Sequence, residues 1–173
     1  MKIILGLGNP GVEYANTRHN AGILLVDNFS QKLSSPYGWR REKNKFIFKS
    51  DKFTLIKTAS VFMNESGNLV KDFQYLTPDP SPNLGEGSLF VVHDDLDIKL
   101  GEYKIQKGMG PKVHNGVLSV ENKLKTKDFW RIRIGIDNRT TPIDGETYVL
   151  QKFSPDERKI LDSVFEEICK KLI

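Results

Sequence analysis

The residues Lys2-Ile3-Ile4-Leu5-Gly6-Leu7-Gly8-Asn9-Pro10-Gly11 join a short apolar run to a loop rich in glycine. An apolar run of this length, ending at glycine, is typical of a buried strand. After the loop, apolar residues recur at helical spacing over about residues 20–34, which predicts a helix. A strand, a loop and a helix in this order favour an α/β domain.

The rest of the chain continues the same alternation of strands and helices. Apolar and alternating runs predict strands at 46–49, 53–57, 89–92, 103–106 and 130–136. Helices are expected after Ser66-Gly67, at 117–124, and from Ser154, where Ser154-Pro155-Asp156-Glu157 forms a capping box. The proline-rich stretch 77–87 is interpreted as an internal loop. Together these elements predict one three-layer α/β/α domain over residues 1–173, with a mixed, mostly parallel twisted sheet.

Length and composition exclude several classes of protein. The chain has 173 residues, of which 38% are hydrophobic and 28% charged, as in a folded globular domain. A single cysteine, Cys169, excludes an intrachain disulfide. No apolar run approaches a membrane span, and the first glycine comes too early for a signal peptide. We therefore expect a cytoplasmic protein without membrane association, and we expect it to be a monomer.

The positive charge is concentrated in one segment. The chain carries a net charge of +4, but residues 99–133 hold nine basic and three acidic residues, a local charge of +6. The remainder is slightly acidic. A regional excess of this kind favours a polyanionic partner such as nucleic acid, although a solvated lysine surface would look similar.

The glycine loop admits a second interpretation. Gly6-Leu7-Gly8-Asn9-Pro10-Gly11 fits the dinucleotide fingerprint G-x-G-x-x-G, and Asp27 follows about twenty residues later. In that fingerprint the helix opens at the glycines, whereas here Pro10 and a polar stretch delay it and place Asp27 inside the helix. A nucleotide-binding oxidoreductase, which would bind NAD or FAD, is thus disfavoured. The glycines are better explained by close approach of the backbone, with Asn9 presented at the edge of a sheet.

A histidine and a carboxylate are the best candidates for chemistry. His19 lies at the start of the first helix, and His93-Asp94-Asp95-Leu96-Asp97 follows an apolar strand. If the strands before Asn9 and Asp94 are adjacent and parallel, Asn9, His19 and Asp94 converge at one edge. A carboxylate beside a neutral imidazole orients the ring and supports proton abstraction from water. The acidic cluster could instead bind a divalent metal or turn the chain, and a lone histidine such as His93 or His114 is usually structural.

Covalent catalysis has little support in the sequence. There is no G-x-S-x-G motif, and Cys169 lies in an amphipathic helix where it looks structural. Water activated by histidine is therefore the simpler mechanism. The amides of Asn9, Asn64 and Asn115 lie in loops or helix starts, where they could hold a peptide backbone or polarise a carbonyl.

Taken together, these motifs resemble those of the bacterial-type peptidyl-tRNA hydrolases. The shared motifs occur in family order and are Gly6–Gly11 with Tyr14, Thr17–Gly22, Phe62–Gly67, His93–Asp97, His114–Gly116 and Arg131–Ile136. The resemblance implies hydrolysis of the ester between a peptide, or an N-blocked aminoacyl group, and the 3′-terminal ribose of tRNA. This reaction recycles tRNA from peptidyl-tRNA.

The resemblance also implies roles for individual residues, and it implies neither a metal nor a cofactor. His19 would activate water, Asp94 would orient His19, and Asn115 would stabilise the oxyanion or position the water. Further residues would bind peptidyl-tRNA through its peptide and acceptor stem: Asn9, Tyr14, Met63, Asn64, Lys104 and Arg133. Among them, Lys104 and Arg133 would grip tRNA phosphates.

The chain departs from the family pattern in three places. The usually glycine-rich segment before Asn115 contains Pro111 and Val113, which stiffen it; Gln106 replaces a lysine; and the chain stops at Ile173, where relatives often continue. An RNA-binding module without catalysis is the second functional hypothesis. It is disfavoured because a pure binding protein has no need of a His–Asp pair.

Overall fold

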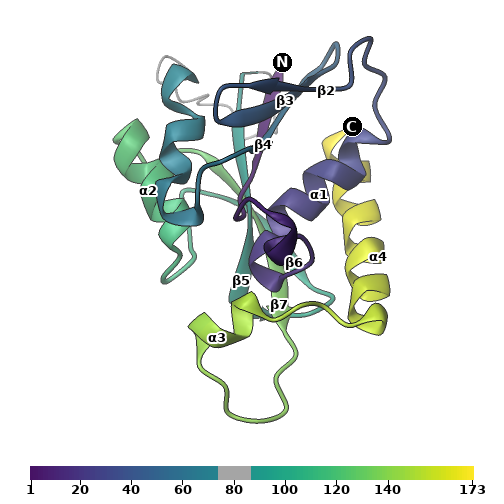
Figure 1. The fold of residues 1–173 in the computed structure, drawn as a ribbon, viewed down its shortest axis with the longest axis vertical. Coiled ribbons are helices and arrows are strands. Elements are labelled where there is room, and N and C mark those ends of the chain that lie inside the picture. Colours follow the sequence, from purple (N-terminus) through teal and green to yellow (C-terminus); the bar gives the residue numbers. More distant parts are fainter. Residues whose placement is uncertain (74–86) are drawn as a thin grey trace.

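A seven-stranded sheet forms the centre of the molecule (Figure 1). The computed structural model describes residues 1–73 and 87–173. Within them the strands are β1 (Lys2–Gly6), β2 (Trp39–Glu42), β3 (Lys45–Lys49), β4 (Phe53–Thr58), β5 (Leu89–Lys99), β6 (Tyr103–Lys107) and β7 (Trp130–Asp137). Their order across the sheet is β2-β3-β4-β1-β5-β7-β6.

The sheet is mixed, as predicted. β1 pairs in parallel with β4 and β5, and β5 pairs in parallel with β7. β3 is antiparallel to both β2 and β4, and β6 is antiparallel to β7. Of the seven strands, β3 and β6 therefore run in the direction opposite to the other five. The parallel strands β1 and β5 lie in the middle, in register from Ile3↔Leu89 to Gly6↔Val92, so their carboxyl ends open at the same edge of the sheet.

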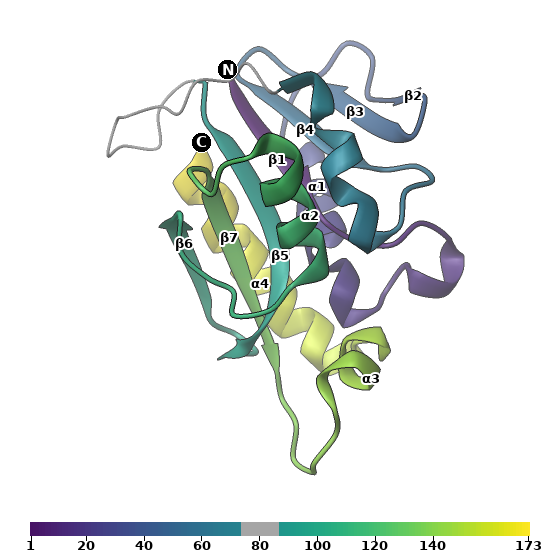
Figure 2. The same cartoon turned by 90° about the vertical axis from the view of Figure 1, so that its left-hand side faces the viewer.

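Helices cover both faces of the sheet and confirm the three-layer arrangement. One face carries α1 (Ala21–Ser30) and α4 (Pro155–Leu172), and the other carries α2 (Asn115–Leu124) and the 3₁₀ helix η3 (Met63–Leu69) (Figures 1 and 2). Alternate residues of β5 enter two separate cores. Phe90 and Val92 pack with the α1 and α4 layer, while Leu89 and Val91 pack with Val117 and its neighbours of the α2 layer.

Short elements complete the fold. They are the 3₁₀ turns η1 (Val12–Tyr14), η2 (Arg18–Asn20) and η4 (Lys71–Phe73), and the helix α3 (Gly145–Leu150), which lies at one end of the molecule (Figure 1). The predicted capping box of α4 is present: Glu157 N–H donates to Ser154 Oγ at 3.2 Å, and Ser154 N–H donates to Glu157 Oε2 at 2.8 Å. Across the described ranges, no helix is long and apolar enough to cross a membrane.

Several predicted boundaries were wrong. The strand predicted at 89–92 continues to Lys99, because β7 supplies pairing partners along it, including Asp94↔Ile134 and Asp95↔Gly135. The helix predicted after Ser66-Gly67 is instead the 3₁₀ segment η3, which begins at Met63, followed by η4. The first helix ends at Ser30 rather than near 34. The predicted loop 77–87, apart from its last residue, lies outside the described residues.

Two elements escaped prediction. The strand β2 has the sequence Trp-Arg-Arg-Glu and lies at the sheet edge, so it has no alternating apolar pattern. The helix α3 has only six residues, too few to show helical periodicity. Its N-cap, Asp144, accepts a hydrogen bond from Thr147 N–H at 2.8 Å, which is the local signal that marks it.

Candidate active site

Segments far apart in the sequence meet at the carboxyl ends of β1 and β5. The loop after β1 brings Asn9, the turn η2 brings His19, β5 brings Asp94, and the start of α2 brings His114 and Asn115. All five residues line one cleft of about 760 Å³. The convergence of Asn9, His19 and Asp94 expected from adjacent parallel strands is therefore observed.

Two histidines share one carboxylate oxygen. His19 Nδ1 lies 2.9 Å from Asp94 Oδ1, and His114 Nε2 lies 2.8 Å from the same oxygen. Asp94 is buried, with 3% of its surface exposed. A buried carboxylate needs such donors, because an unpaired charge in this environment is strongly disfavoured.

The hydrogen-bond network fixes which nitrogen of each ring carries a proton. His114 is the N-cap of α2, and its Nδ1 accepts hydrogen bonds from the backbone N–H groups of Gly116 and Val117. His114 Nε2 must therefore carry the hydrogen that it donates to Asp94. His19 likewise donates from Nδ1, which leaves its Nε2 lone pair as a base at the cleft that His19 lines.

The electrostatics of the pair suit a general base. Burial disfavours the imidazolium form of His19, but the charge and hydrogen bond of Asp94 outweigh it and raise the pKa of His19. Burial also opposes ionisation of Asp94, yet His19 and His114 together hold the pKa of that carboxyl well below its usual range. Asp94 thus stays ionised wherever His19 titrates.

One 3₁₀ turn holds His19 between two anchors. On one side, Arg18 Nη2 pairs with Glu157 Oε2 of α4 at 3.0 Å, and both side chains are buried. On the other side, the Asn20 amide bonds both backbone groups of Asn9, accepting from its N–H at 2.8 Å and donating to its carbonyl at 2.9 Å. The side chains of η2 therefore fasten His19 to the α4 layer and to the loop after β1.

A glycine lets α1 approach the sheet behind this turn. A Cβ on Gly22 would lie 2.6 Å from Leu7 N and closer still to Val92 O, which no real side chain tolerates. The start of α1 therefore rests directly on the backbone of β5 and of the residue after β1. This close approach brings His19 within reach of Asp94 across the sheet edge.

Three asparagines present amides at the cleft. Asn9 Oδ1 accepts from Met63 N–H at 2.8 Å, so the Asn9 amide nitrogen is turned away from that bond and free to donate. Met63 itself is buried and lines the cleft. Asn64 and Asn115 are exposed cleft residues, and their amides form no hydrogen bond within the described part of the chain. These groups can bind carbonyl oxygens of a substrate.

Hydrogen bonds account for the close approach of His19, Asp94 and His114. His19, Asp94 and His114 bring their ligand atoms within 4.8 Å of one another, as a metal site would. However, the nitrogens that face Asp94 lie 2.8 and 2.9 Å from its oxygen and both carry protons. A zinc ion bound by these two nitrogens would have to displace both protons.

His93 and Asp95 point to the opposite side of β5 from Asp94. His93 is fully buried, and its Nδ1 bonds the carbonyl of Asp94 at 2.7 Å. Its Nε2 has no hydrogen-bond partner among residues 1–73 and 87–173, and burial lowers the pKa of His93 to about 3, so this ring is neutral. His93 is thus a core residue behind the site.

The predicted tRNA-binding residues lie outside the cleft. Lys104 on β6 and Arg133 on β7 are register partners and therefore share one face of the sheet. Lys104 is exposed, whereas Arg133 donates from Nε to Asp95 at 2.7 Å and from Nη1 to Gln106 at 2.7 Å. Lys104 is thus free to bind a phosphate, and Arg133 is partly committed to protein contacts.

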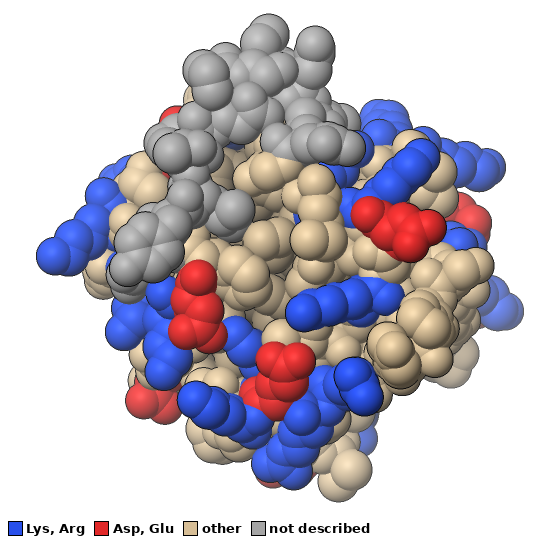
Figure 3. All heavy atoms as spheres, turned by 90° about the horizontal axis from the view of Figure 1, so that it is seen from above, with Lys and Arg blue, Asp and Glu red and all other residues tan. Residues whose placement is uncertain are grey.

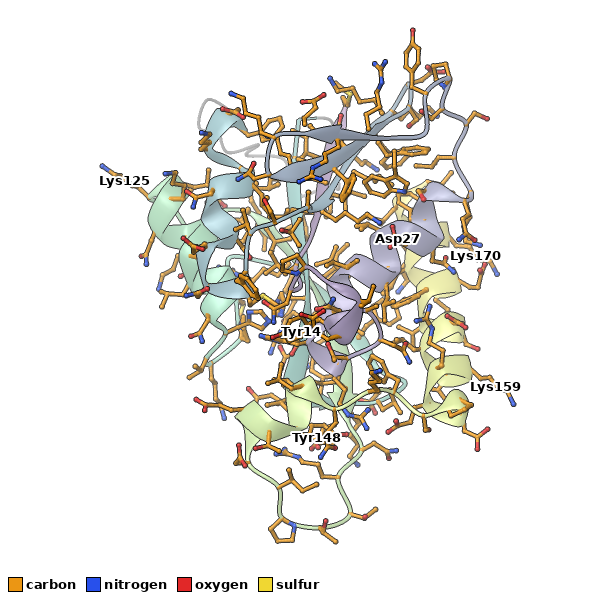
Figure 4. All side chains as sticks on the ribbon, in the orientation of Figure 1. Tyr14, Asp27, Lys125, Tyr148, Lys159 and Lys170 are labelled. Atoms are coloured by element: carbon orange, nitrogen blue, oxygen red, sulfur yellow. The ribbon has the colours of Figure 1, made fainter. Side chains whose placement is uncertain are left out.

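Basic residues also cover surfaces remote from the cleft. Lysines and arginines surround the end of the molecule opposite α3, with acidic residues among them (Figure 3). Lys125 on the α2 side and Lys159 on α4 project outward on opposite sides (Figure 4). Total charge alone therefore does not locate a tRNA surface.

Tyr14 lies beside the cleft rather than in its wall. It lies in front of the sheet, in the loop before α1 (Figure 4), and its ring meets Phe62 edge to face at 6.2 Å. Phe62 lines the cleft. Asp27 lies inside α1, as expected, and pairs with Lys57 at 2.5 Å. Since α1 begins only at Ala21, the dinucleotide-binding interpretation has no structural support.

Some cleft residues were not predicted from the sequence. A structural role was expected for His114, although its place directly before a helix start is a signal for a cap. The cleft residues Val149 and Leu150 were not predicted either, because they belong to α3, which the sequence did not indicate. The atypical loop also contributes, since Pro111, Lys112 and Val113 all line the cleft.

Comparison with known proteins shows the family of this chain. A family model described as peptidyl-tRNA hydrolase matches residues 3–173. The peptidyl-tRNA hydrolase of Prochlorococcus marinus is 36% identical over 99% of this chain and 86% of its own. That of Thermodesulfovibrio yellowstonii is 39% identical over 97% of this chain and 89% of its own. The crystal structure of the Acinetobacter baumannii peptidyl-tRNA hydrolase superposes with a TM-score of 0.80 at 28% identity, covering 99% of this chain and 86% of that chain. This chain belongs to the peptidyl-tRNA hydrolase family.

Proposed function

We propose that this protein hydrolyses the ester bond between a peptide, or an N-blocked aminoacyl group, and the 3′-terminal ribose of tRNA. The observation that carries the proposal is the His19–Asp94 pair at 2.9 Å, which leaves His19 Nε2 unprotonated at a cleft with free amides. Family membership over nearly the whole chain names the reaction that this site would perform.

The residues support a single sequence of steps. His19 Nε2 takes a proton from water as the water oxygen attacks the ester carbonyl carbon. The carbonyl oxygen becomes an oxyanion, which the Asn115 amide stabilises at the positive end of α2. The intermediate then collapses, the ribose oxygen leaves and takes the proton from His19, and the products are the peptide acid and free tRNA.

Other residues would bind rather than react. The amides of Asn9 and Asn64 would hold the peptide, with Met63 forming part of the cleft wall. Tyr14, next to Phe62, would border the terminal nucleotides, and Lys104 and Arg133 would contact tRNA phosphates on the β6–β7 face. No metal or cofactor has a role in these steps.

The site needs residues from one chain only, so we propose that the protein acts as a monomer, and that it does so in the cytoplasm, where tRNA is used. Light scattering during size-exclusion chromatography would measure the mass of the particle in solution. A stable dimer would contradict this part of the proposal.

The function is tested with N-acetyl-aminoacyl-tRNA and unblocked aminoacyl-tRNA that share one tRNA body. We expect release of the blocked group only, and a loss of at least about 10²-fold in turnover for His19→Ala. Asn115→Ala should lower kcat, while Asn122→Ala on the same helix serves as its matched control. Tight tRNA binding without release of the acyl group would favour the alternative of a non-catalytic RNA-binding module.

A further inference from the structure

The cleft is lined by two chemically different sets of residues. Polar groups include Asn9, His19 and Asn115, and apolar side chains come from β5, α3 and the loop before α2. These apolar wall residues are Leu96, Pro111, Val113, Val149 and Leu150. Val113 is 86% exposed and Leu150 is 49% exposed. Large apolar side chains that remain open to solvent inside a concave site mark a place where an apolar group binds.

We propose that this wall is a subsite for the side chain of the peptide's C-terminal residue, and that it makes the enzyme prefer apolar residues there. The proposal rests on the proposed function, because the C-terminal residue is the one whose carbonyl must reach His19. Since the wall and the catalytic groups share one cleft, a carbonyl placed at Asn115 puts its own side chain within the same enclosure.

Charge favours the peptide over the tRNA as the occupant. Asp97 and Glu146 line the same cleft as the apolar side chains, and neither forms an ion pair in the described residues. Lys112 is the accompanying cation, and it likewise lacks an ion pair there. Two carboxylates against one ammonium give a net negative rim, which repels a nucleotide phosphate or an acidic side chain and tolerates a neutral one.

The loop before α2 gives the wall a defined shape. His114 is tied at one ring nitrogen to Asp94 and at the other to the start of α2, so the residue after Val113 is fixed. Val113 is β-branched and Pro111 has a fixed φ, so both lose little conformational freedom when a ligand binds. The substitution of bulky residues into this loop therefore extends the apolar wall beside the catalytic histidine.

The subsite predicts an order among substrates that differ only in the acyl residue. N-acetyl-leucyl, N-acetyl-glycyl and N-acetyl-aspartyl groups are attached to one tRNA body, and kcat/KM is measured for each. We expect leucyl to exceed glycyl by at least about tenfold, which is the scale of a few buried methylene groups, and aspartyl to be the poorest.

Isosteric variants test which side chains cause the preference for an apolar acyl residue. Val113→Thr and Leu150→Asn keep the size of each side chain but add polar atoms, and each should reduce the leucyl-to-glycyl ratio of kcat/KM several-fold. Leu118→Asn is the matched control, because Leu118 is 53% exposed on α2 but does not line the cleft. Circular dichroism and thermal melting of each variant verify that it is folded.

Two results would overturn the subsite. One is a wild-type enzyme that hydrolyses leucyl and glycyl substrates equally well. The other is an equal loss on all three substrates in Val113→Thr and Leu150→Asn, which would mean that the wall contacts the tRNA end. Failure to hydrolyse any blocked substrate would instead refute the proposed function, and NMR titration with N-acetyl-leucinamide against N-acetyl-glycinamide would then test the wall by binding alone.

Discussion

His114 caps helix α2 with one ring nitrogen and holds the Asp94 carboxylate with the other. The Nδ1 atom accepts from two backbone N–H groups, and the Nε2 atom lies 2.8 Å from Asp94 Oδ1. The same carboxylate oxygen accepts a hydrogen bond from His19 Nδ1. The geometry of the His19–Asp94 pair is therefore coupled to the start of the helix that carries Asn115.

His114→Asn should separate these two roles. Asparagine is a good N-cap, so α2 should keep its stability, but its side chain is too short to reach Asp94. Loss of a hydrogen bond to a charged group costs about 1.5–3 kcal/mol, so we expect kcat to fall roughly 10–100-fold with KM nearly unchanged. Steady-state kinetics and thermal melting measure the two effects. A variant with normal kcat would show that His114 serves only as a cap.

Asp94→Asn should move the acid limb of the pH–rate profile. In the wild type Asp94 raises the pKa of His19, so kcat/KM should rise with pH through a midpoint above 6.5. Without the carboxylate charge, burial dominates and lowers that pKa, so the midpoint should move to a lower pH. The plateau should fall by roughly 10²–10⁴-fold, because the ring loses its orientation. An unchanged midpoint would argue against His19 as the titrating base.

The Arg18–Glu157 pair should stabilise the fold and hold the turn that carries His19. Breaking a buried pair from one side costs about 3–5 kcal/mol, so Arg18→Met should lower both the unfolding free energy and kcat. In a double-mutant cycle, Glu157→Gln should lower the unfolding free energy less in the Arg18→Met variant than in the wild type. Ser154→Ala is the control, because it removes the cap of α4 for about 1 kcal/mol and leaves Arg18 paired. Additive losses in the cycle would mean that the two residues act independently.

His93 should make the protein lose stability on acidification. Its pKa is about 3 in the folded protein and near 6.5 when unfolded, so only the unfolded chain takes up a proton between these values. Stability is therefore complete above about pH 6.5 and falls by at most about 1.4 kcal/mol per pH unit below it. Urea unfolding at pH 7 and pH 5 should show this slope in the wild type and a smaller one in His93→Gln. Equal slopes would exclude His93 as the source.

Lys104→Ala should weaken tRNA binding without altering the chemistry. Lys104 is exposed on the β6–β7 face and lies outside the cleft, so KM should rise while kcat stays the same. Loss of one phosphate contact should reduce the slope of log Kd against log salt by about 1. Binding titrations at several salt concentrations measure this slope, with Lys159→Ala on α4 as the control. An unchanged slope would place the phosphate contact elsewhere.

The sequence predicted most of the central fold and the convergence of Asn9, His19 and Asp94 at one edge of the sheet. The strand before Asn9 and the strand before Asp94 were recognisable because residues buried on both faces form continuous apolar runs. The capping box at Ser154 was recognisable because its signal is local. By contrast, β2 and α3 depend on pairing and packing partners distant in the chain, so their short polar sequences carried no periodic signal.

What the sequence determined by itself is the set of chemical groups: a histidine at a helix start, a carboxylate after a buried strand, and amides in glycine-rich loops. Only the tertiary structure decided how they are used. The parallel pairing of β1 with β5 brought His19 to Asp94, and the start of α2 added His114 on the same oxygen. The tertiary structure also placed α3 and Val113 around one cleft. These relations depend on sheet order and helix packing, which connect residues at least 20 positions apart, beyond the reach of any local pattern.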